Sequence, residues 1–461
     1  MITEIDIDLI KKYNVRGPRY TSYPTALQFK EIDDAETATN RLKAYLAERN
    51  REPRPLSLYF HIPFCFSLCW YCGCTKIITK DRSRGDLYLE YLNREMDRIK
   101  EQVHPGSEVV QIHFGGGTPT FLTPEQLLRL GSAIRARFLT GADTEFGIEI
   151  DPRRCTRAHV EAMSEIGCNR ASVGVQDTNP KVQEAIHRNQ TFEQTRKVTE
   201  WLREEGIDSI NFDLVYGLPL QTKDAFRKTM NDVLRLEPDR LAVYSYAHIP
   251  QVMPSQKLLN AEQMPSADEK LSIYLDAIGF FTEHGYRFIG MDHFSREGEE
   301  LARAMDEGTL QRNFQGYSTL SGADLYAFGM SGISNAGALY WQNAKELPEY
   351  YDALDRGALP IRKMLPLSKD DLIRRDVIMH IMCKSSLSGR EIEIKWGIDF
   401  NSYFRDALSR LAELESDGLV KRAEKEITIT NRGRLFLRNI ALCFDRYYRE
   451  AKSDRKFSKT V

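Results

Sequence analysis

Between residues 56 and 294, short runs rich in β-branched and aromatic residues alternate with longer stretches whose apolar positions recur at helical spacing. The runs predict six strands, at residues 56–62, 108–114, 145–150, 170–176, 209–217 and 240–248, and a seventh candidate covers 286–294. The stretches between them carry apolar residues three or four positions apart, which predicts helices. This alternation is typical of βα units around a parallel sheet, either open or closed into a barrel.

The two faces of these strands differ in polarity. The first strand places Leu56, Leu58, Phe60 and Ile62 on one face and Ser57, Tyr59 and His61 on the other. Glu149, Gln176 and Asp213 fall opposite the apolar residues of later strands in the same way. A parallel strand covered by helices on both faces would be apolar on both. We therefore expect a rolled sheet with a polar, functional interior, namely a partial (β/α)6 barrel of the TIM type.

The segments that flank this core have other patterns. Residues 17–26, GPRYTSYPTA, are rich in Tyr, Pro and Thr, which favours an extended strap over a helix. Beyond about residue 360, two helical patterns and a short hairpin resemble a winged helix, although the mixed charge there favours a packing or lid role over DNA binding. The expected division is 1–50 (strap), 51–295 (core), 296–360 (core extension and linker) and 361–461 (helical C-terminal domain).

Composition adds mainly exclusions. The chain has 461 residues and a formal net charge of −2, so no global charge points to nucleic acid or a membrane surface. No apolar run approaches the ~20 residues of a membrane helix. The N-terminal residues carry acids early and lack the basic-then-apolar order of a signal peptide, which favours a cytoplasmic location.

Four of the eight cysteines lie within ten residues, in HIPFCFSLCWYCGC directly after the first predicted strand. Cys65, Cys69 and Cys72 can hold three irons of a [4Fe–4S] cluster and leave the fourth iron open. S-adenosylmethionine can chelate that iron, and electron transfer into its sulfonium then releases a 5′-deoxyadenosyl radical. Structural zinc and a four-thiolate cluster are alternatives, but zinc prefers two separated cysteine pairs and the ferredoxin spacing is absent.

The second predicted strand ends in HFGGGTPT, residues 113–120. Three glycines let a backbone approach a ligand closely, yet the order fits neither the dinucleotide-binding motif nor the P-loop. A glycine triplet alone is more often a tight turn. At the same end of the sheet as the cysteine loop, it becomes a candidate cradle for the methionine end of the cofactor.

The CxxxCxxC and GGGTP motifs resemble the radical S-adenosylmethionine superfamily. A closer likeness covers essentially the whole chain, because GPRYTSYPTA, LSLYFHIPFC, CWYCGCTKI, GGGTPTFL, GVQDTNP, NFDLVYGLP, GMDHF and RNFQGYST resemble the oxygen-independent coproporphyrinogen III oxidases of haem synthesis. This resemblance implies that two propionates of coproporphyrinogen III become vinyl groups, giving protoporphyrinogen IX and two CO2. The alternative is another porphyrin-modifying or haem-transfer protein on the same core, and a third class is a winged-helix regulator with an iron–sulfur sensor.

The resemblance also implies roles for individual residues. Cys65, Cys69 and Cys72 would hold the cluster, and Cys74 would be a non-ligand near the substrate. The cluster-bound S-adenosylmethionine would contact Tyr59, Gly116, Glu149 and Ile333. A second S-adenosylmethionine would contact Tyr71, Gly117, Thr118, Gln176, Arg188, Asp213 and Ala247.

The substrate carries four carboxylates, so cationic partners are expected. Arg19 in the strap is the favoured candidate, followed by Arg153. We expect a monomer that binds this small molecule and no nucleic acid or membrane. The electron donor and acceptor are not identified by the sequence.

Overall fold

The computed structural model describes residues 7–314, 316–320 and 322–450, and these form two compact units. We call residues 29–273 and 322–366 the barrel unit, and the described parts of 1–28, 274–321 and 367–461 the tail unit. Residues 1–6 of the expected strap, residues 451–461 of the expected C-terminal domain and position 315 of the RNFQGYST motif lie outside the described residues.

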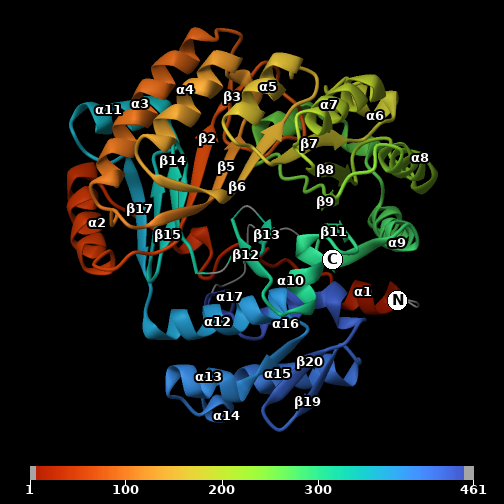
Figure 1. Cartoon of the computed structure of the whole chain (residues 1–461). Coiled ribbons are helices and arrows are strands. Elements are labelled where there is room, and N and C mark those ends of the chain that lie inside the picture. The colour runs from red at the N-terminus through yellow and green to blue at the C-terminus, as the bar shows by residue number, and fades with distance from the viewer. Residues whose placement is uncertain (1–6, 315, 321, 451–461) are drawn as a thin grey trace. The chain divides into compact units, whose positions relative to one another are not determined.

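Six neighbouring parallel strands form the centre of the barrel unit, as the sequence predicted (Figure 1). In spatial order they are β2 (Leu56–Ile62), β5 (Glu108–Gly116), β6 (Leu139–Ile150), β7 (Arg170–Gln176), β8 (Ser209–Tyr216) and β9 (Arg240–Ser245). The bounds of β2 and β7 match the prediction, whereas β6 begins six residues earlier and β9 ends three residues sooner. The expected partial (β/α)6 barrel is confirmed.

Helices cover the outer face of this sheet (Figure 1). They are α3 (Ser83–Lys100), α4 (Pro124–Arg135), α5 (Arg157–Glu165), α6 (Pro180–Ala185), α7 (Phe192–Glu204) and α8 (Lys223–Leu234). Their starts follow from the sequence: Thr123 and Thr191 each form a capping box with a glutamine three residues later. Phe60 is fully buried and packs between Phe114 and Phe328, with ring centroids 5.4 and 4.9 Å away.

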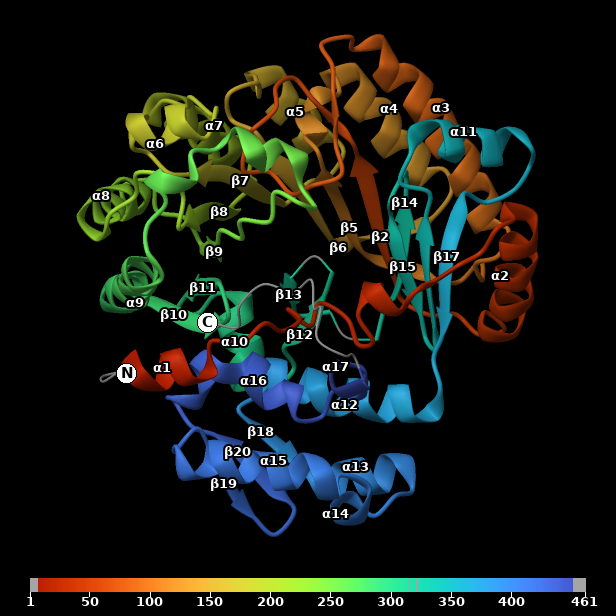
Figure 2. The same ribbon diagram turned by 180° about the vertical axis from the view of Figure 1, so that it is seen from behind.

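The sheet continues beyond β2 into a region where the sequence had indicated no strands (Figure 2). There β14 (Asp324–Phe328) pairs parallel with β2, and it is followed by antiparallel strands β15 (Ile333–Ala336), β16 (Leu339–Asn343), β17 (Ile361–Pro366) and β1 (Lys30–Glu31). Helices α2 (Ala35–Arg49) and α11 (Leu347–Asp355) flank this extension. Arg49 makes a bidentate ion pair with the buried Asp324, with contacts of 2.7 and 2.6 Å. That pair fixes the start of β14.

The prediction of a seventh strand over residues 286–294 as one continuous element is wrong. Residues 286–296 form an antiparallel hairpin in the tail unit, β10 (Tyr286–Gly290) with β11 (His293–Arg296). The chain reverses where Gly290 and Met291 both take positive φ, at 152° and 53°. An apolar run that spans a turn resembles one long strand in sequence, which explains the error.

The remaining elements of the tail unit begin with α1 (Ile7–Tyr13), and residues 14–25 contain no helix, as expected for a strap. Tyr20 donates to Asp445 at 2.8 Å, and Arg438 donates to the carbonyl of Pro18 at 2.8 Å. The strap is thus bound to residues in and just after the helix at 437–442. The other elements are α10 (Glu300–Asp306), β12 (Gln311–Asn313), β13 (Gly316–Ser318), α16 (Leu437–Leu442) and α17 (Arg446–Glu450). Helix α9 (Ala267–Glu283) carries the chain between the units.

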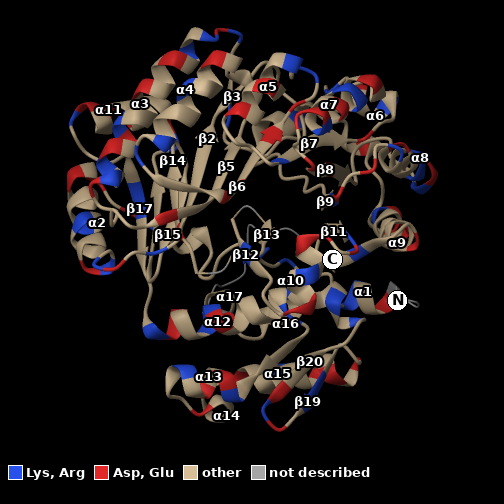
Figure 3. Ribbon diagram, viewed as in Figure 1, with Lys and Arg blue, Asp and Glu red and all other residues tan. Residues whose placement is uncertain are grey.

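The winged-helix pattern predicted for the C-terminal region is present. It consists of α12 (Lys369–Cys383), β18 (Ser386–Ser388), α13 (Gly389–Trp396), α14 (Phe400–Tyr403), α15 (Arg405–Ser416), β19 (Val420–Ala423) and β20 (Glu426–Ile429), with the strands in the order β18-β20-β19. Acidic and basic residues are mixed along these elements (Figure 3). The region therefore shows no single-sign stripe that would suit a nucleic-acid backbone.

Candidate active site

The cysteine loop begins at the carboxyl end of β2. It is pinned at its base by two short strands, β3 (Phe64–Cys65) and β4 (Ile77–Ile78), which pair in parallel. Further along, the amide of Trp70 donates to the carbonyl of Ile186 at 3.1 Å. The loop is thus held both to its own strand and to the end of α6, which fixes where the thiols project.

The three predicted cluster ligands lie in different polar surroundings. Cys65 contacts the hydroxyl of Thr118 at 3.4 Å, and burial raises the pKa of its thiol to about 12. Cys69 lies 3.5 Å from a guanidinium nitrogen of Arg153 and 3.7 Å from one of Arg188. A hydrogen bond from Cys74 lowers the pKa of Cys72. Polar or cationic groups therefore lie beside the thiols that are proposed to bind iron.

Among the described residues, no three His, Cys, Asp or Glu side chains are grouped to hold a single metal ion. Three thiolates on three irons of a cluster need not converge in this way. Together with the unpartnered Nε of buried Arg188, this donor set fits a cluster with a further ligand beside it.

The glycine triplet lies against the start of the cysteine loop. A Cβ on Gly117 would come within 2.5 Å of the carbonyl oxygen of Pro63, and one on Gly115 within 2.8 Å of a Glu149 oxygen. Gly116 has a φ of 117°, a conformation that L residues rarely adopt. Gly117 is therefore a glycine because the strand end and the loop backbone approach each other closely, and Gly115 leaves room for the Glu149 side chain. This close packing supports the cradle predicted from the sequence.

The polar face of the first three strands converges inside the barrel. Glu149 accepts a hydrogen bond from the amide of Gly116 at 3.1 Å and lies 3.4 Å from the imidazole of His113. Tyr59 stacks on His113 with ring centroids 6.0 Å apart, and its hydroxyl lies 3.2 Å from His61. The structure thus brings together Tyr59, Gly116 and Glu149, three of the four residues expected at the first cofactor molecule.

A second polar group lies on β7 and β8. Asp213 accepts hydrogen bonds from the hydroxyl of Ser172 at 2.8 Å and from the amide of Asn211 at 2.9 Å, and burial raises its pKa to about 6. A β-bulge at the end of β7 leaves Gln176 with a φ of 68°. Bulges and positive φ at non-glycine residues are concentrated at functional sites because they redirect a side chain.

Arg188 connects this group to the cysteine loop. One guanidinium nitrogen donates to the carbonyl of Gly174 at 2.7 Å, while another lies 3.4 Å from Asp151 and near Cys69. Asp151 also binds Arg153 at 2.7 Å. Burial acts to raise the pKa of Asp151, but the two guanidinium groups lower it well below its usual range. The carboxylate therefore stays ionised and holds both cations beside Cys69.

The other predicted residues have less direct placements. Tyr71 and Ala247 are joined through Gln256, whose side-chain amide donates to both of their carbonyl oxygens at 3.2 Å. Ile333 lies at the start of β15, and Cys74 is exposed on the cysteine loop. Arg19 belongs to the tail unit, where its guanidinium is bound to Asp292.

Four contributors were not identified from the sequence: Asp151, Ser172, Asn211 and Gln256. Ser172 and Asn211 share the inward face of their strands with Gln176 and Asp213, so the period-2 pattern could have found them. Asp151 directly follows β6, at the carboxyl end where functional residues gather in such barrels. Gln256 carried no such signal, because its role depends on two loops that meet only in the fold.

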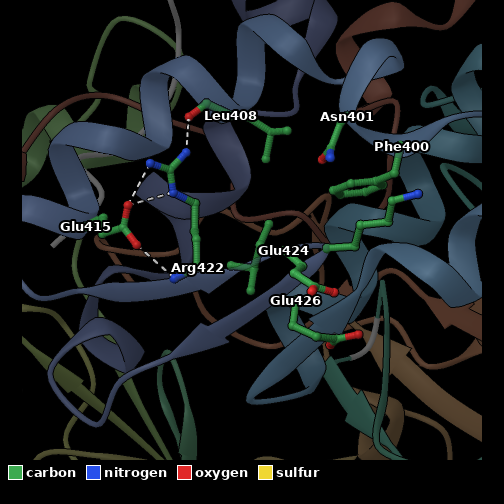
Figure 4. Close-up of a pocket in the computed structure, with 9 residues that line it drawn as sticks. Phe400, Asn401, Leu408, Glu415, Arg422, Glu424 and Glu426 are labelled. Atoms are coloured by element: carbon green, nitrogen blue, oxygen red, sulfur yellow. Dashed lines mark hydrogen bonds and ion pairs between the residues drawn. The ribbon is translucent and has the colours of Figure 1, made fainter.

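A further cavity of about 320 Å³ lies in the winged-helix region of the tail unit (Figure 4). On one side Arg422 binds Glu415 and the carbonyl of Leu408, and on the other side lie Glu424 and Glu426. The cations lining it are paired with carboxylates. No residue expected from the sequence to act in catalysis lines it.

The parallel half-barrel, the three-cysteine loop and the glycine cradle define a radical S-adenosylmethionine enzyme, and the family model of the radical SAM superfamily matches residues 59–233. The HemN C-terminal domain matches residues 367–436. Two oxygen-independent coproporphyrinogen III oxidases, from Pseudomonas aeruginosa and Escherichia coli, are each 45% identical to the chain over 99% of its length and 98% of theirs. The chain belongs to the family of oxygen-independent coproporphyrinogen III oxidases.

A solved structure supports the same placement. The coproporphyrinogen III oxidase of Escherichia coli matches with a TM-score of 0.91 and 43% sequence identity, over 97% of this chain and 100% of that chain. Membership of the superfamily implies a [4Fe–4S] cluster and S-adenosylmethionine as cofactors. No described helix combines the length and apolar character that crossing a bilayer requires.

Proposed function

We propose that this chain converts coproporphyrinogen III into protoporphyrinogen IX without oxygen, by oxidative decarboxylation of two propionates to vinyl groups. Full-length likeness to enzymes of that name supports the reaction. The observation that carries the proposal is the meeting of the cysteine loop, the glycine cradle and a polar barrel interior at one end of the sheet. A purely structural role for this region would not require these three features together.

Cys65, Cys69 and Cys72 are the proposed cluster ligands. When bound, the cluster and S-adenosylmethionine supply a carbon-centred radical that removes a hydrogen atom from a propionate. The chain provides the surroundings for this chemistry. Asp151 holds Arg153 and Arg188 against Cys69, so two positive charges face a group of thiolates.

We further propose that two S-adenosylmethionine molecules bind. The first would lie against Tyr59, Gly116, Glu149 and Ile333. The second would lie against Tyr71, Gly117, Thr118, Gln176, Arg188, Asp213 and Ala247. Two separate polar groups support this division, one around Glu149 and His113, the other around Asp213 with Ser172 and Asn211.

The residues of the second group are suited to a cationic, amine-bearing ligand. Ser172 and Asn211 orient both oxygens of Asp213, and the ionised carboxylate can receive a positively charged group. Arg188 presents its unpartnered Nε close by and can receive a carboxylate. Cys74 is a proposed neighbour of the substrate and not a cluster ligand.

Arg19 is the proposed partner of a substrate carboxylate, and Asp292 occupies its guanidinium in the structure. Arg153 is the second candidate, and Asp151 takes up its donors in the same way. Because the mixed charge of the winged-helix region does not suit a phosphate backbone, we propose no nucleic-acid partner. We also propose that the protein is a monomer without a membrane partner. We place it in the cytosol, because a cluster held by thiolates needs a reducing compartment.

An anaerobic assay tests the reaction. Reconstituted protein receives reductant, S-adenosylmethionine, coproporphyrinogen III and a cell extract as the source of an electron acceptor, and the oxidised porphyrins are separated by chromatography. We expect protoporphyrin together with 5′-deoxyadenosine, and loss of both in Cys69→Ala. Cys168→Ala is the matched control, because Cys168 is a buried thiol outside the cysteine loop.

Two other outcomes have distinct meanings. If 5′-deoxyadenosine forms without protoporphyrin, the radical core stands and the substrate assignment falls. If neither forms although iron and sulfide are present at about four each per chain, the haem-transfer alternative takes precedence.

A further inference from the structure

A cavity of about 420 Å³ lies beside the cysteine loop, entirely within the barrel unit. One side is the loop segment that follows the last proposed cluster ligand, and the other sides come from the starts of α3 and α11 and from residues after β9 and β14. The lining residues are Gly73, Cys74, Thr75, Lys76, Ile77, Arg84, Met253, Met330, Lys345, Glu346, Leu347 and Pro348. Of these residues, only Cys74 belongs to the proposed active site.

Positive charge predominates in this cavity, with Lys76, Arg84 and Lys345 against the single carboxylate of Glu346. The ammonium of Lys76 donates to the carbonyl oxygens of Cys72 and Cys74 at 3.2 and 3.3 Å, which uses two of its three donors. Within the described part of the chain, neither Arg84 nor Lys345 forms an ion pair. Arg84 lies over the ring of Phe64, 5.6 Å from its centroid, and its charge also acts on the exposed carboxyl of Asp81. A cavity in which cations outnumber carboxylates favours an anionic ligand.

Several other lining side chains are apolar. Ile77, Met253, Met330 and Leu347 come from four different segments of the chain. Methionine side chains adapt to flat or irregular ligands because they are unbranched and polarisable. Cationic and apolar walls together suit an amphipathic ligand with carboxylate arms on a hydrophobic body.

The wall formed by Met330 and Lys345 is held in place by a buried glutamate. Glu95 on α3 accepts hydrogen bonds from the amide of Gly329 at 2.7 Å, the side chain of Asn343 at 2.6 Å and the hydroxyl of Tyr350 at 2.7 Å. These residues flank Met330 and Lys345 in the chain. The cavity is therefore built on a fixed frame, which lowers the cost of ordering side chains when a ligand binds.

The cavity adjoins the proposed cofactor site. The carbonyl of Thr75 lies 3.0 Å from the imidazole of His61, on the polar face of β2. Cys74, which lines the cavity, follows the proposed cluster ligand Cys72 by two residues on the same loop. A ligand held in the cavity would thus lie next to the interior where the radical chemistry is proposed to occur.

We propose that this cavity binds a propionate-bearing edge of the tetrapyrrole substrate, with Arg84 and Lys345 receiving carboxylates and with Ile77 and Met253 packing on the pyrrole rings. This inference rests on the proposed function and assigns its substrate site. A volume of about 420 Å³ accommodates one edge of the macrocycle, and the remainder extends along the open side of the cavity. The remaining donor of the Lys76 ammonium would bind the same carboxylate, and its two hydrogen bonds to the loop would hold the segment around Cys74 beside it.

Binding of coproporphyrin III, a stable fluorescent tetracarboxylate, tests this site without turnover. Fluorescence titrations on anaerobically reconstituted protein would compare the wild type with Arg84→Gln, Lys345→Gln and the double variant. Loss of one charge-assisted contact should weaken binding about tenfold, and loss of both about a hundredfold. Coproporphyrin III tetramethyl ester, which lacks the charges, should bind weakly and equally to all variants.

The double variant Lys80→Gln, Arg82→Gln is the matched control. It also removes one lysine and one arginine charge near the cysteine loop, but neither residue lines the cavity. It should change the dissociation constant less than threefold. Iron content and circular dichroism equal to wild type would establish that the variants fold.

Two results would overturn the assignment. An unchanged dissociation constant in the folded double variant would place the substrate elsewhere. If that variant also loses cluster reduction by an acidic flavodoxin while keeping reduction by dithionite, the cavity is instead part of an electron-donor surface. Failure of the wild type itself to bind coproporphyrin III would reject this site, whereas the proposed function stands or falls with the anaerobic turnover assay.

Discussion

A guanidinium nitrogen of Arg188 lies 3.7 Å from the sulfur of Cys69, although 119 positions separate the two residues. Arg188 is 6% exposed, and its other contacts, to Gly174 and Asp151, fix its orientation. The positive charge beside this thiol is therefore a built feature of the barrel. Its consequence is electrostatic, because reduction adds a negative charge to the cluster that Cys69 is proposed to hold.

Arg188→Met removes this charge and keeps most of the side-chain volume. We expect the midpoint potential of the cluster to fall by on the order of 50 mV, since the reduced state loses a cationic neighbour. A redox titration followed by electron paramagnetic resonance measures this. Arg196→Met, on the exposed face of α7, should leave the potential unchanged, and an unchanged potential in Arg188→Met would exclude the electrostatic role.

Replacement of Asp213 separates cofactor binding from cluster assembly. Asp213→Ala should weaken binding of S-adenosylmethionine about tenfold, because the cofactor loses a carboxylate partner that two hydrogen bonds orient. Iron content should remain at the wild-type value. Normal turnover in the variant would instead indicate a purely structural hydrogen bond.

The pKa of Asp213, raised to about 6 by burial, predicts a pH dependence as well. The carboxylate gains a proton as the pH falls through 6, so affinity for a cationic ligand should decline there. In Asp213→Asn this decline should disappear, since the amide does not titrate. Equilibrium binding measured from pH 5 to pH 8 would reveal the difference.

Glycine replacements test the close approach between cradle and cysteine loop. In Gly117→Ala the new Cβ would lie 2.5 Å from the backbone oxygen of Pro63, so loop or strand must move. We expect iron content after reconstitution to fall below half of the wild-type value. Gly73→Ala is the matched control within the same loop, because its Cβ would meet no atom within 4 Å and iron content should be retained.

The buried Glu95 predicts a change of stability with pH. Burial raises its pKa to about 7, above the ordinary value of 4.5, so the folded protein retains a proton that the unfolded chain loses. The stabilisation by this proton is fully present below pH 4.5 and is lost as the pH rises through 7, by ~3 kcal/mol in total.

Glu95→Gln should reduce this loss, because its amide is neutral at every pH. Denaturant unfolding at pH 5.5 and pH 8 would give the difference in unfolding free energy between variant and wild type. Glu90→Gln, an exposed change on the same helix, should show no comparable effect. A pH dependence equal in wild type and Glu95→Gln would contradict the role of this carboxyl.

Local patterns predicted much of the barrel. The six central strands were found because β-branched and aromatic runs alternate with capped amphipathic helices, and β2 and β7 were placed to the residue. The strands β14 to β17 were missed because each is short and β14 finds its partner in β2, more than 260 residues earlier. The turn between β10 and β11 was also missed. Met291 takes a positive φ there, and methionine has no preference for that conformation that the sequence could reveal.

The candidate site shows the same division. Spacing alone indicated the cysteine loop, and strand alternation placed Tyr59, Glu149, Gln176 and Asp213 on one side. Asp151 could not be assigned beforehand, because its importance arises from holding two arginines that approach from different loops. Interactions between segments distant in the chain carry no local sequence signal.

The parallel pairing of β14 with β2 has a consequence for biosynthesis. The chain emerges from the ribosome in order, so β2 must wait through more than 260 further residues before β14 can cover its free side. Until then its backbone donors and acceptors are a template for unwanted pairing. A nascent or truncated chain that ends before β14 should therefore aggregate and require chaperones, even though its cysteine loop and glycine cradle are already complete.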